Sequence, residues 1–146
     1  MHKFTALKDG VNEPLLAEVR KRVAEMLKDF FDPEDLTVVD DITAFSFGSA
    51  TVQIQVVPWH TEDVLVRVFS YLAENADPTS GELGEKLLRL NATAPMGAFS
   101  LVFDRTIMFS CALPGAHLDA NELLGALQTV AAYADQYDDL LQEMFA

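Results

Sequence analysis

The first clear pattern in the chain is helical and lies near its N-terminal end. Between residues 15 and 31 the large apolar residues recur at steps of three and four, which places them along one side of an α-helix. Asn12 can cap the first turn, and Pro14 is tolerated there because an N–H at that position would be unpaired in any case. Asp32-Pro33 predicts the end of the helix, since the residue before a proline is displaced from helical geometry.

Five later segments have the character of strands. Residues 42–47 and 51–57 alternate between apolar and polar positions on either side of a Gly48-Ser49 turn, which predicts a hairpin with one buried face. Residues 64–72 are rich in β-branched and aromatic side chains and predict a third, more buried strand. Residues 99–103 and 107–113 predict a second hairpin.

Two further helices begin with recognisable caps. Thr79 and Glu82 have the spacing of a capping box, with Leu83 and Leu87 on the inner edge of the helix that follows. Asp119 and Glu122 form an aspartate version of the same box. The apolar residues after this second box again step by three and four, which predicts a helix roughly 35–40 Å long; they are Leu123, Leu127, Val130, Ala134, Tyr137, Leu141 and Met144.

The predicted element order is α-β-β-β-α-β-β-α. Short loops between consecutive strands imply antiparallel pairing, so we expect an α+β fold in which helices cover an antiparallel sheet. The length of 146 residues and the absence of a linker or repeat predict a single domain over residues 1–146, with residues 1–12 as a flexible N-terminal segment.

Charge narrows the possible partners. The chain holds 23 acidic and ten basic residues, for a formal net charge of −13. Proteins that bind phosphates need clustered Lys and Arg, so we expect neither nucleic acid nor an anionic membrane as a partner. Six of the ten basic residues lie in the first thirty positions and none follows Arg105. The acidic C-terminal end either serves solubility or faces a basic client.

Localisation follows from two further patterns. No stretch reaches the roughly 20 apolar residues that a membrane-spanning helix needs. The first ten residues have no long apolar core of the kind found in a secretory signal. We therefore expect a cytoplasmic protein.

The sequence offers no recognisable catalytic, metal or cofactor site. Cys111 is the single cysteine and lies in an apolar run, which is typical of a buried thiol. His2, His60 and His117 stand apart from one another and lack the spacing of zinc ligands. Phosphate-loop, dinucleotide and nucleophile-elbow motifs are absent. We therefore predict no enzyme activity and no cofactor.

A surplus of apolar side chains points to binding instead. The first helix has eight large hydrophobic residues. Phe45 and Phe47 share one face of the first predicted strand, opposite Ile42, Ala44 and Ser46, so both faces of that strand carry apolar residues. Core filling explains part of this surplus. The predicted contacts for a peptide are Val19, Val23, Phe30, Phe45 and Phe47. The predicted contacts for self-association are Leu83, Leu87, Tyr137, Leu141 and Met144.

Three blocks of the chain resemble a known family. They are residues 87–92 (Leu-Leu-Arg-Leu-Asn-Ala), residues 95–101 (Pro-Met-Gly-Ala-Phe-Ser-Leu) and residues 132–139 (Ala-Tyr-Ala-Asp-Gln-Tyr-Asp-Asp). Together with the element order they are similar to the YbjN-like proteins, often labelled bacterial sensory transduction regulators, which share a fold with class I type III secretion chaperones. The resemblance covers about residues 13–146. It implies a non-enzymatic role in binding a protein or peptide, often as a homodimer, and no catalytic residues to carry over.

Three functional hypotheses remain open from the sequence. The first is a chaperone-like or regulatory module that binds an extended client segment, which would use the first helix and the sheet edge or exposed face. The second is a small-molecule receptor or enzyme whose site is assembled from scattered residues, which would require a closed apolar pocket with convergent polar groups. The third is a structural subunit of a larger complex.

Overall fold

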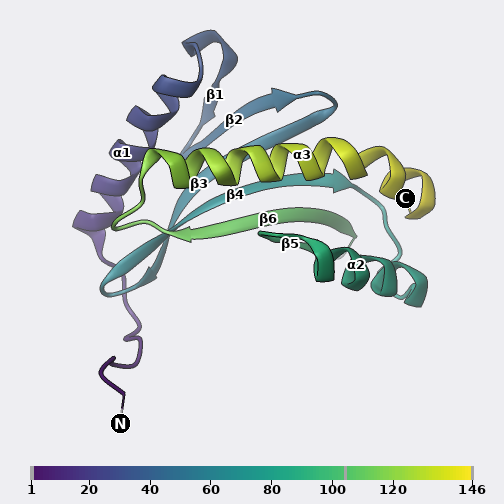
Figure 1. The fold of residues 1–146 in the computed structure, drawn as a ribbon, viewed down its shortest axis with the longest axis horizontal. Coiled ribbons are helices and arrows are strands. Elements are labelled where there is room, and N and C mark those ends of the chain that lie inside the picture. The colour runs from purple at the N-terminus through teal and green to yellow at the C-terminus, as the bar shows by residue number, and fades with distance from the viewer. Residues whose placement is uncertain (1, 104, 146) are drawn as a thin grey trace.

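The computed structural model describes residues 2–103 and 105–145 and has the predicted α+β architecture (Figure 1). Its three α-helices are α1 (Glu13–Phe30), α2 (Gly81–Thr93) and α3 (Ala120–Phe145). Its strands form one antiparallel sheet of six in the order β1-β2-β3-β4-β6-β5. The strands are β1 (Thr37–Val39), β2 (Ile42–Phe47), β3 (Ala50–His60), β4 (Asp63–Ala73), β5 (Ala98–Val102) and β6 (Thr106–Pro114).

The sheet has one strand more than the sequence patterns predict. After α1, a short 3₁₀ helix (Pro33–Asp35) leads into β1, which is three residues long and forms one edge of the sheet. A strand this short cannot show a period of two, so the alternation that reveals β2 and β3 is absent here. Asp40 turns the chain from β1 into β2 with a φ of 55°, a conformation that aspartate tolerates better than most residues.

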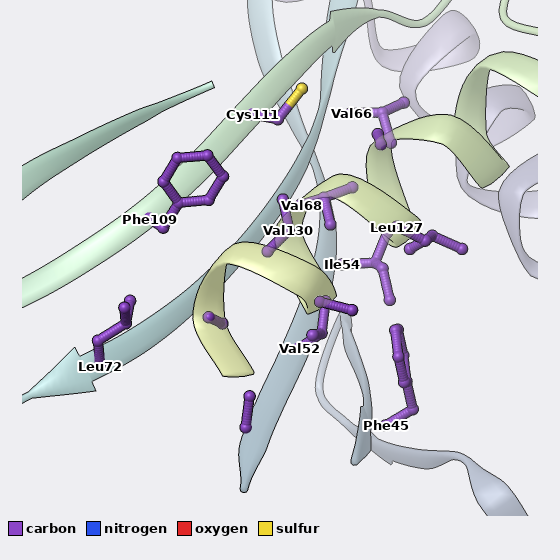
Figure 2. Close-up of a cluster of buried hydrophobic side chains, with 14 of the residues drawn as sticks. Phe45, Val52, Ile54, Val66, Val68, Leu72, Phe109, Cys111, Leu127 and Val130 are labelled. Atoms are coloured by element: carbon purple, nitrogen blue, oxygen red, sulfur yellow. The ribbon is translucent and has the colours of Figure 1, made fainter. Parts of the chain in front are cut away.

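All three helices contribute to one hydrophobic core on one face of the sheet. α3 lies across β3, β4 and β6, as Figure 1 shows. In the close-up of Figure 2, Leu127 and Val130 of α3 lie over Val52 and Ile54 of β3 and Val66 and Val68 of β4. The same core contains buried residues of α1 and α2, whereas Phe69 and Met108, which are buried on the opposite face of the sheet, lie outside it. The opposite face therefore has no helix over it in the described part of the chain.

The helix caps confirm two predictions and correct a third. The Asn12 side chain accepts a hydrogen bond from the Leu15 N–H at 3.1 Å. Asp119 and Glu122 each accept the other's backbone N–H, at 2.8 and 3.0 Å, as a capping box requires. α2, however, is capped by Ser80, whose hydroxyl accepts the N–H of Leu83.

The expected cap of α2 was Thr79, and its hydroxyl is used elsewhere. The Asp77 carboxylate accepts both the N–H and the hydroxyl of Thr79, which fixes an Asx turn just before the helix. These bonds also hold the pKa of Asp77 below its ordinary value. Within the described residues, no helix is long and apolar enough to span a bilayer.

Candidate functional site

An open apolar hollow lies where the C-terminal end of α1 meets β2 and α3. It has a volume of about 390 Å³, and we call it the α3 hollow. The residues that line it are Phe30, Phe31, Phe45, Phe47, Leu124, Leu127, Gln128 and Ala131. Gln128 is the one polar side chain in this set, so the hollow offers almost only hydrocarbon and aromatic surface to an occupant.

The register of β2 explains why two phenylalanines meet in this hollow. Phe45 pairs with Val52 and Phe47 with Ala50, so both aromatic rings project to the helix-covered face. Phe45 is 7% exposed and its ring lies 4.5 Å from that of Phe31, centroid to centroid, whereas Phe47 is 49% exposed. Phe45 therefore forms the base of the hollow, and Phe47 stands at its rim.

A second hollow lies on the other side of Phe31, between α1 and β1. It has a volume of about 420 Å³, and we call it the β1 hollow. Its lining consists of Ala24, Leu27, Lys28, Phe31, Asp32, Pro33, Leu36, Val38 and Thr43. Because Phe31 lines both hollows, they are neighbours, and an extended chain could place side chains in both.

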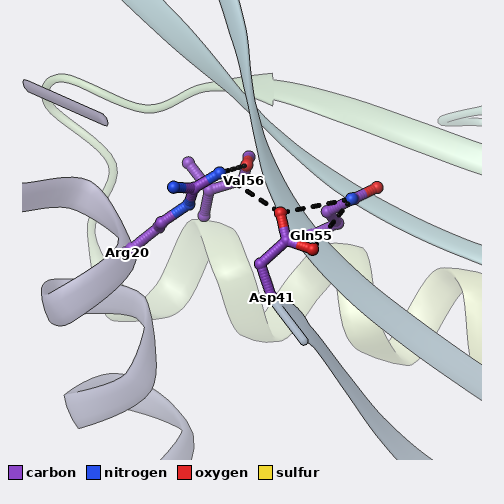
Figure 3. A network of polar contacts seen from close by, with 4 residues as sticks. All are labelled: Arg20, Asp41, Gln55 and Val56. Atoms are coloured by element: carbon purple, nitrogen blue, oxygen red, sulfur yellow. Dashed lines mark hydrogen bonds and ion pairs between the residues drawn. The ribbon is translucent and has the colours of Figure 1, made fainter. Parts of the chain in front are cut away.

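A polar network holds the middle of α1 to the sheet beside these hollows (Figure 3). The Arg20 guanidinium contacts the Asp41 carboxylate at 3.2 Å and the Val56 carbonyl at 3.4 Å, and Asp41 also accepts from the Gln55 amide. The Arg20 and Asp41 side chains are 43% and 37% exposed, so the ion pair adds at most about 1 kcal/mol of stability. It adds to the core packing that holds α1 against the sheet, and the two hollows open beyond this point, toward the end of the helix.

Two acids of α3 fix the turn next to Phe47. The Asp135 carboxylate accepts the N–H of Ser49, and the buried Asp138 carboxylate accepts the Ser49 hydroxyl at 2.7 Å. Gly48 has a φ of +57°, and a side chain at this position would overlap the Asp135 carboxylate. The end of β2, with its exposed phenylalanine, is therefore held against α3.

Acidic residues flank the two hollows. Asp32 lines the β1 hollow, and the exposed Glu34 and Asp35 follow it in the 3₁₀ helix. Asp135 lies at the Gly48–Ser49 turn beside the α3 hollow. Lys28 is the one basic residue among those that line either hollow. The rim therefore favours an occupant that carries positive charge next to apolar side chains.

The predicted peptide contacts divide into core and surface residues. Phe30, Phe45 and Phe47 come together in the α3 hollow, as a binding site requires. Val19 and Val23 are 1% and 5% exposed and pack in the core, because they lie on the inner edge of α1 that faces the sheet. These two residues offer no surface to a client in this structure.

Most of the predicted self-association residues are also part of the core. Leu83, Leu87 and Leu141 are buried in the single chain, since the α2 and α3 stripes that they belong to pack onto the sheet. Tyr137 is partly buried, with its ring edge-on to that of Phe99 at 5.5 Å, and Met144 is exposed. Of these five residues, Met144 is the one whose side chain is clearly exposed to solvent in the single chain.

Several lining residues were missed by the sequence patterns. Leu124 follows Leu123 in the sequence and lies beside the predicted apolar stripe of α3. Val38 lies in a strand too short to recognise. Phe31 was visible as part of the first apolar stripe, but its place between two hollows depends on the chain leaving the helix there in an extended conformation. For Leu124 and Phe31, the available signal was an apolar stripe wider than one helix face needs.

The chemistry of the described residues is that of a binding surface. They contain no group of three or more His, Cys, Asp and Glu that could hold a metal ion. Burial raises the pKa of the Cys111 thiol, which lowers the fraction of reactive thiolate at neutral pH. The α3 hollow is open and has no set of convergent polar groups, in contrast to a typical small-molecule site.

Comparisons with known proteins agree with this description. Residues 17–146 match the sequence model of the family described as T3SS (YopN, CesT) and YbjN peptide-binding chaperone 1. Among solved structures, a chain in the crystal structure of the ExsC-ExsE complex is similar with a TM-score of 0.63 and 14% sequence identity. The similarity covers 88% of this chain and 96% of that chain, and at this identity it concerns the fold. No curated protein sequence matches the chain.

Proposed function

Because the chain belongs to the family of T3SS (YopN, CesT) and YbjN peptide-binding chaperones, we propose that it binds an extended segment of a client protein across the α3 and β1 hollows. The family consists of peptide-binding proteins, and the chain is not an enzyme. The observation that carries the proposal is the pair of neighbouring apolar hollows that share Phe31, since a buried client side chain in each would provide most of the affinity.

The client segment in this proposal is apolar and basic. Two apolar side chains on the same side of an extended chain would enter the two hollows, and Lys or Arg residues between or beside them would face the acids of the rim. The exposed aromatic ring of Phe47 would close over the client as an anchor. A net charge of −13 would speed the association with such a segment, most strongly at low salt.

The outer edge of β1 offers a second kind of contact. β1 pairs with β2 on one side, and as an edge strand it presents unpaired backbone groups on the other. Val38, next to the β1 hollow, is 66% exposed. A client strand added at this edge would gain main-chain hydrogen bonds while its side chains reached the hollow. This mode suits either a chaperone that keeps a client unfolded or a regulator that sequesters a partner, acting in the cytoplasm.

The test uses synthetic probe peptides. A fluorescein-labelled peptide of about twelve residues, with Phe and Leu at alternating positions and Lys between them, is titrated with the protein and followed by fluorescence anisotropy. The control peptides carry Glu in place of Lys or Ser in place of Phe and Leu. We expect micromolar binding of the basic apolar probe and at least a tenfold loss for each control. The Ser control loses apolar burial, which contributes about 1.5–3 kcal/mol for one large side chain. The Glu control places negative charge against the acids of the rim.

A matched pair of protein variants locates the site. Phe47→Asp at the rim of the α3 hollow should weaken the probe about tenfold or more. Leu88→Asp, at an exposed apolar residue of α2 that lines neither hollow, should leave the affinity unchanged. Equal affinity of all peptides, or equal loss in both variants, would contradict the proposed site.

We also propose that the chain forms a homodimer through the helix-free face of the sheet. Three of the five residues first expected to mediate self-association are core residues, which favours a different surface. The register places on this face the rows Ala44–Gln53–Phe69–Ser110–Ala98, Ile42–Gln55–Arg67–Ala112 and Tyr71–Met108–Ser100. None of these residues is acidic, although the chain has 23 acids. Two strongly negative chains would meet with the least repulsion across such a face.

The exposed Tyr71 and Phe103, at one end of this face, would form the centre of the dimer contact, and the buried Phe69 would support them. The Arg67 guanidinium lies 4.9 Å from the centre of the Phe69 ring, and the Tyr71 ring is edge-on to Phe69 at 5.6 Å. Phe103, 76% exposed, lies 5.7 Å from Tyr71 between ring centres. Clusters of this kind are enriched at the centres of protein interfaces.

Sedimentation equilibrium tests the dimer. A Tyr71→Ser/Phe103→Ser variant should shift the mass of the protein to that of a monomer, and Met144→Ser on α3 should not. Dissociation by Met144→Ser alone would place the interface on the last helix instead, and a monomeric unsubstituted protein at high micromolar concentration would refute the dimer.

A further inference from the structure

Residues 2–12 form an arm that contains no helix or strand and leaves the body of the protein near the start of α1 (Figure 1). Each residue of the arm before Asn12 is exposed. Its large apolar side chains share this exposure: Phe4 is 72% exposed and Leu7 61%. Apolar side chains on an extended segment gain nothing from the core, so they are available to another surface.

The C-terminal part of the arm is hydrogen-bonded to the turn between β3 and β4. The Thr61 N–H donates to the Lys8 carbonyl at 3.1 Å, and the Asn12 side chain donates to the Thr61 carbonyl at 3.0 Å. Gly10 passes close to the Thr61 side chain, where a Cβ would lie 2.7 Å from the threonine methyl group. These contacts fix residues 8–12. Residues 5–7 lie along the same turn and line a shallow hollow with His60 and Glu62, but they stay exposed, as residues 2–4 do.

The charge of the arm is opposite to that of the rest of the chain. Residues 1–12 hold Lys3, Lys8 and Asp9 and have a net charge of +1. Since the whole chain has a net charge of −13, residues 13–146 have a net charge of −14. The arm thus combines lysines with Phe4 and Leu7, which is the chemistry that the acidic rim and the apolar lining of the two hollows accept.

The arm is too short to reach the hollows of its own chain while it is attached to Thr61. The hollows lie at the C-terminal end of α1, and the 18 residues of this helix separate them from Asn12 by about 27 Å. From Lys8 back to Phe4 an extended chain covers at most about 14 Å. A hollow that receives this arm without breaking its attachment must therefore belong to a second copy.

We propose that residues 2–7 occupy the α3 and β1 hollows of a second copy of this chain and compete there with the client segment. This inference rests on the proposed function, because it identifies one occupant of the same site. Phe4 would enter a hollow, and the lysines of the arm would face the rim acids. The arm keeps the apolar hollows covered until a client displaces it, and the competition increases with protein concentration.

The experiment uses the full chain with its own arm disabled by Phe4→Ser/Leu7→Ser. Both residues are exposed, so the fold is retained, which circular dichroism and the urea midpoint verify. A fluorescein-labelled peptide with the sequence of residues 2–12 is titrated with this variant by anisotropy. The control is the same peptide with the two serines. We expect the native arm peptide to bind at least about tenfold more tightly, and Phe47→Asp in the protein to abolish this difference.

The outcomes separate the arm from the proposed function. If the basic apolar probe peptide binds and the arm peptide does not, the arm proposal is overturned and the client site stands. If neither peptide binds, both fail. In a second measurement, the probe affinity is determined at several protein concentrations. For the unsubstituted chain, the affinity should fall as the protein concentration rises. For the Phe4→Ser/Leu7→Ser chain, it should stay constant. Competition that does not depend on concentration would mean that the arm folds onto its own body, which overturns docking to a second copy.

Discussion

The two ends of the sheet differ in how completely their apolar side chains are buried. Beneath α3, the strands β3, β4 and β6 form a closed core in which Val52, Val68 and Phe109 have no measurable exposure (Figure 2). At the β1–β2 end, the same face of the sheet carries Phe47 and Val38 largely in solvent, beside two apolar hollows. The helix-covered face of the sheet therefore changes from buried core at β3 to exposed surface at β2 and β1.

The cause of this difference is the direction of the helices. α3 lies along the centre of the sheet and covers β3, β4 and β6, whereas α1 is held by Arg20 at its middle and leaves hollows beyond that point. Closed packing provides the free energy of folding, and the uncovered apolar end is left for binding. Substitutions at the two ends should accordingly affect different measurements.

The largest expected effect is on stability at the closed end. Phe109→Ala removes a buried ring that stacks on Tyr133 at 4.9 Å between centroids, and it should lower the free energy of unfolding by about 3–5 kcal/mol. Urea denaturation followed by circular dichroism measures this change. A loss below about 1 kcal/mol would show that this end of the protein is not closely packed.

The sharpest comparison uses two phenylalanines on one strand. Phe45→Ala should cost about 2–3 kcal/mol of stability, because its ring is buried at the base of the α3 hollow. Phe47→Ala, at the rim, should cost less than about 1 kcal/mol and weaken the binding of the basic apolar probe peptide about tenfold. Urea midpoints and anisotropy titrations of both variants provide the data. Equal stability losses at the two positions would remove the distinction between base and rim.

The elements with long, regular patterns could be predicted from the sequence. The stripe of α1 repeats over several helical turns, and the alternation of β2 and β3 repeats over several residue pairs. The capping box of α3 is a local pair of residues. Local chemistry therefore determines all three features. β1 could not be predicted, since three residues contain no period and the strand exists because β2 offers an edge. The cap of α2 was assigned one residue too early, because Asp77 competes for the hydroxyl of Thr79.

The candidate site could be predicted only in part. The pattern gives the faces of α1 and β2, and it identified Phe30, Phe45 and Phe47, which meet in one hollow. It could not separate them from Val19 and Val23, because exposure depends on how α1 packs on the sheet, and that is a property of the tertiary structure. The same limit explains why Leu83, Leu87 and Leu141 were expected at a surface and are found in the core.

A glycine pair tests how firmly the turn beside Phe47 is held. Gly48→Ala should destabilise the protein by about 1–2 kcal/mol, since its φ of +57° disfavours a side chain and the Cβ would displace Asp135 from Ser49. The control, Gly125→Ala, lies inside α3 with open space around its Cβ and should stabilise by about 0.5–1 kcal/mol. Thermal unfolding of both variants measures the difference. A neutral Gly48→Ala would mean that the turn moves freely.

The smallest expected effect concerns the thiol of Cys111, which can report on the closed end alone. Burial among the core residues of β6 raises the pKa of this thiol above its ordinary value, so at neutral pH less thiolate is present than in the unfolded chain. Labelling by a thiol reagent should therefore be slow in the native protein and fast in urea. Phe109→Ala, which loosens the same region, should speed it, whereas Phe47→Ala should leave the rate unchanged because the hollows open without disturbing β6. An equal increase of the labelling rate in both variants would show that the open end and the core unfold as one unit. Binding at the open end and stability at the closed end would then not be independent.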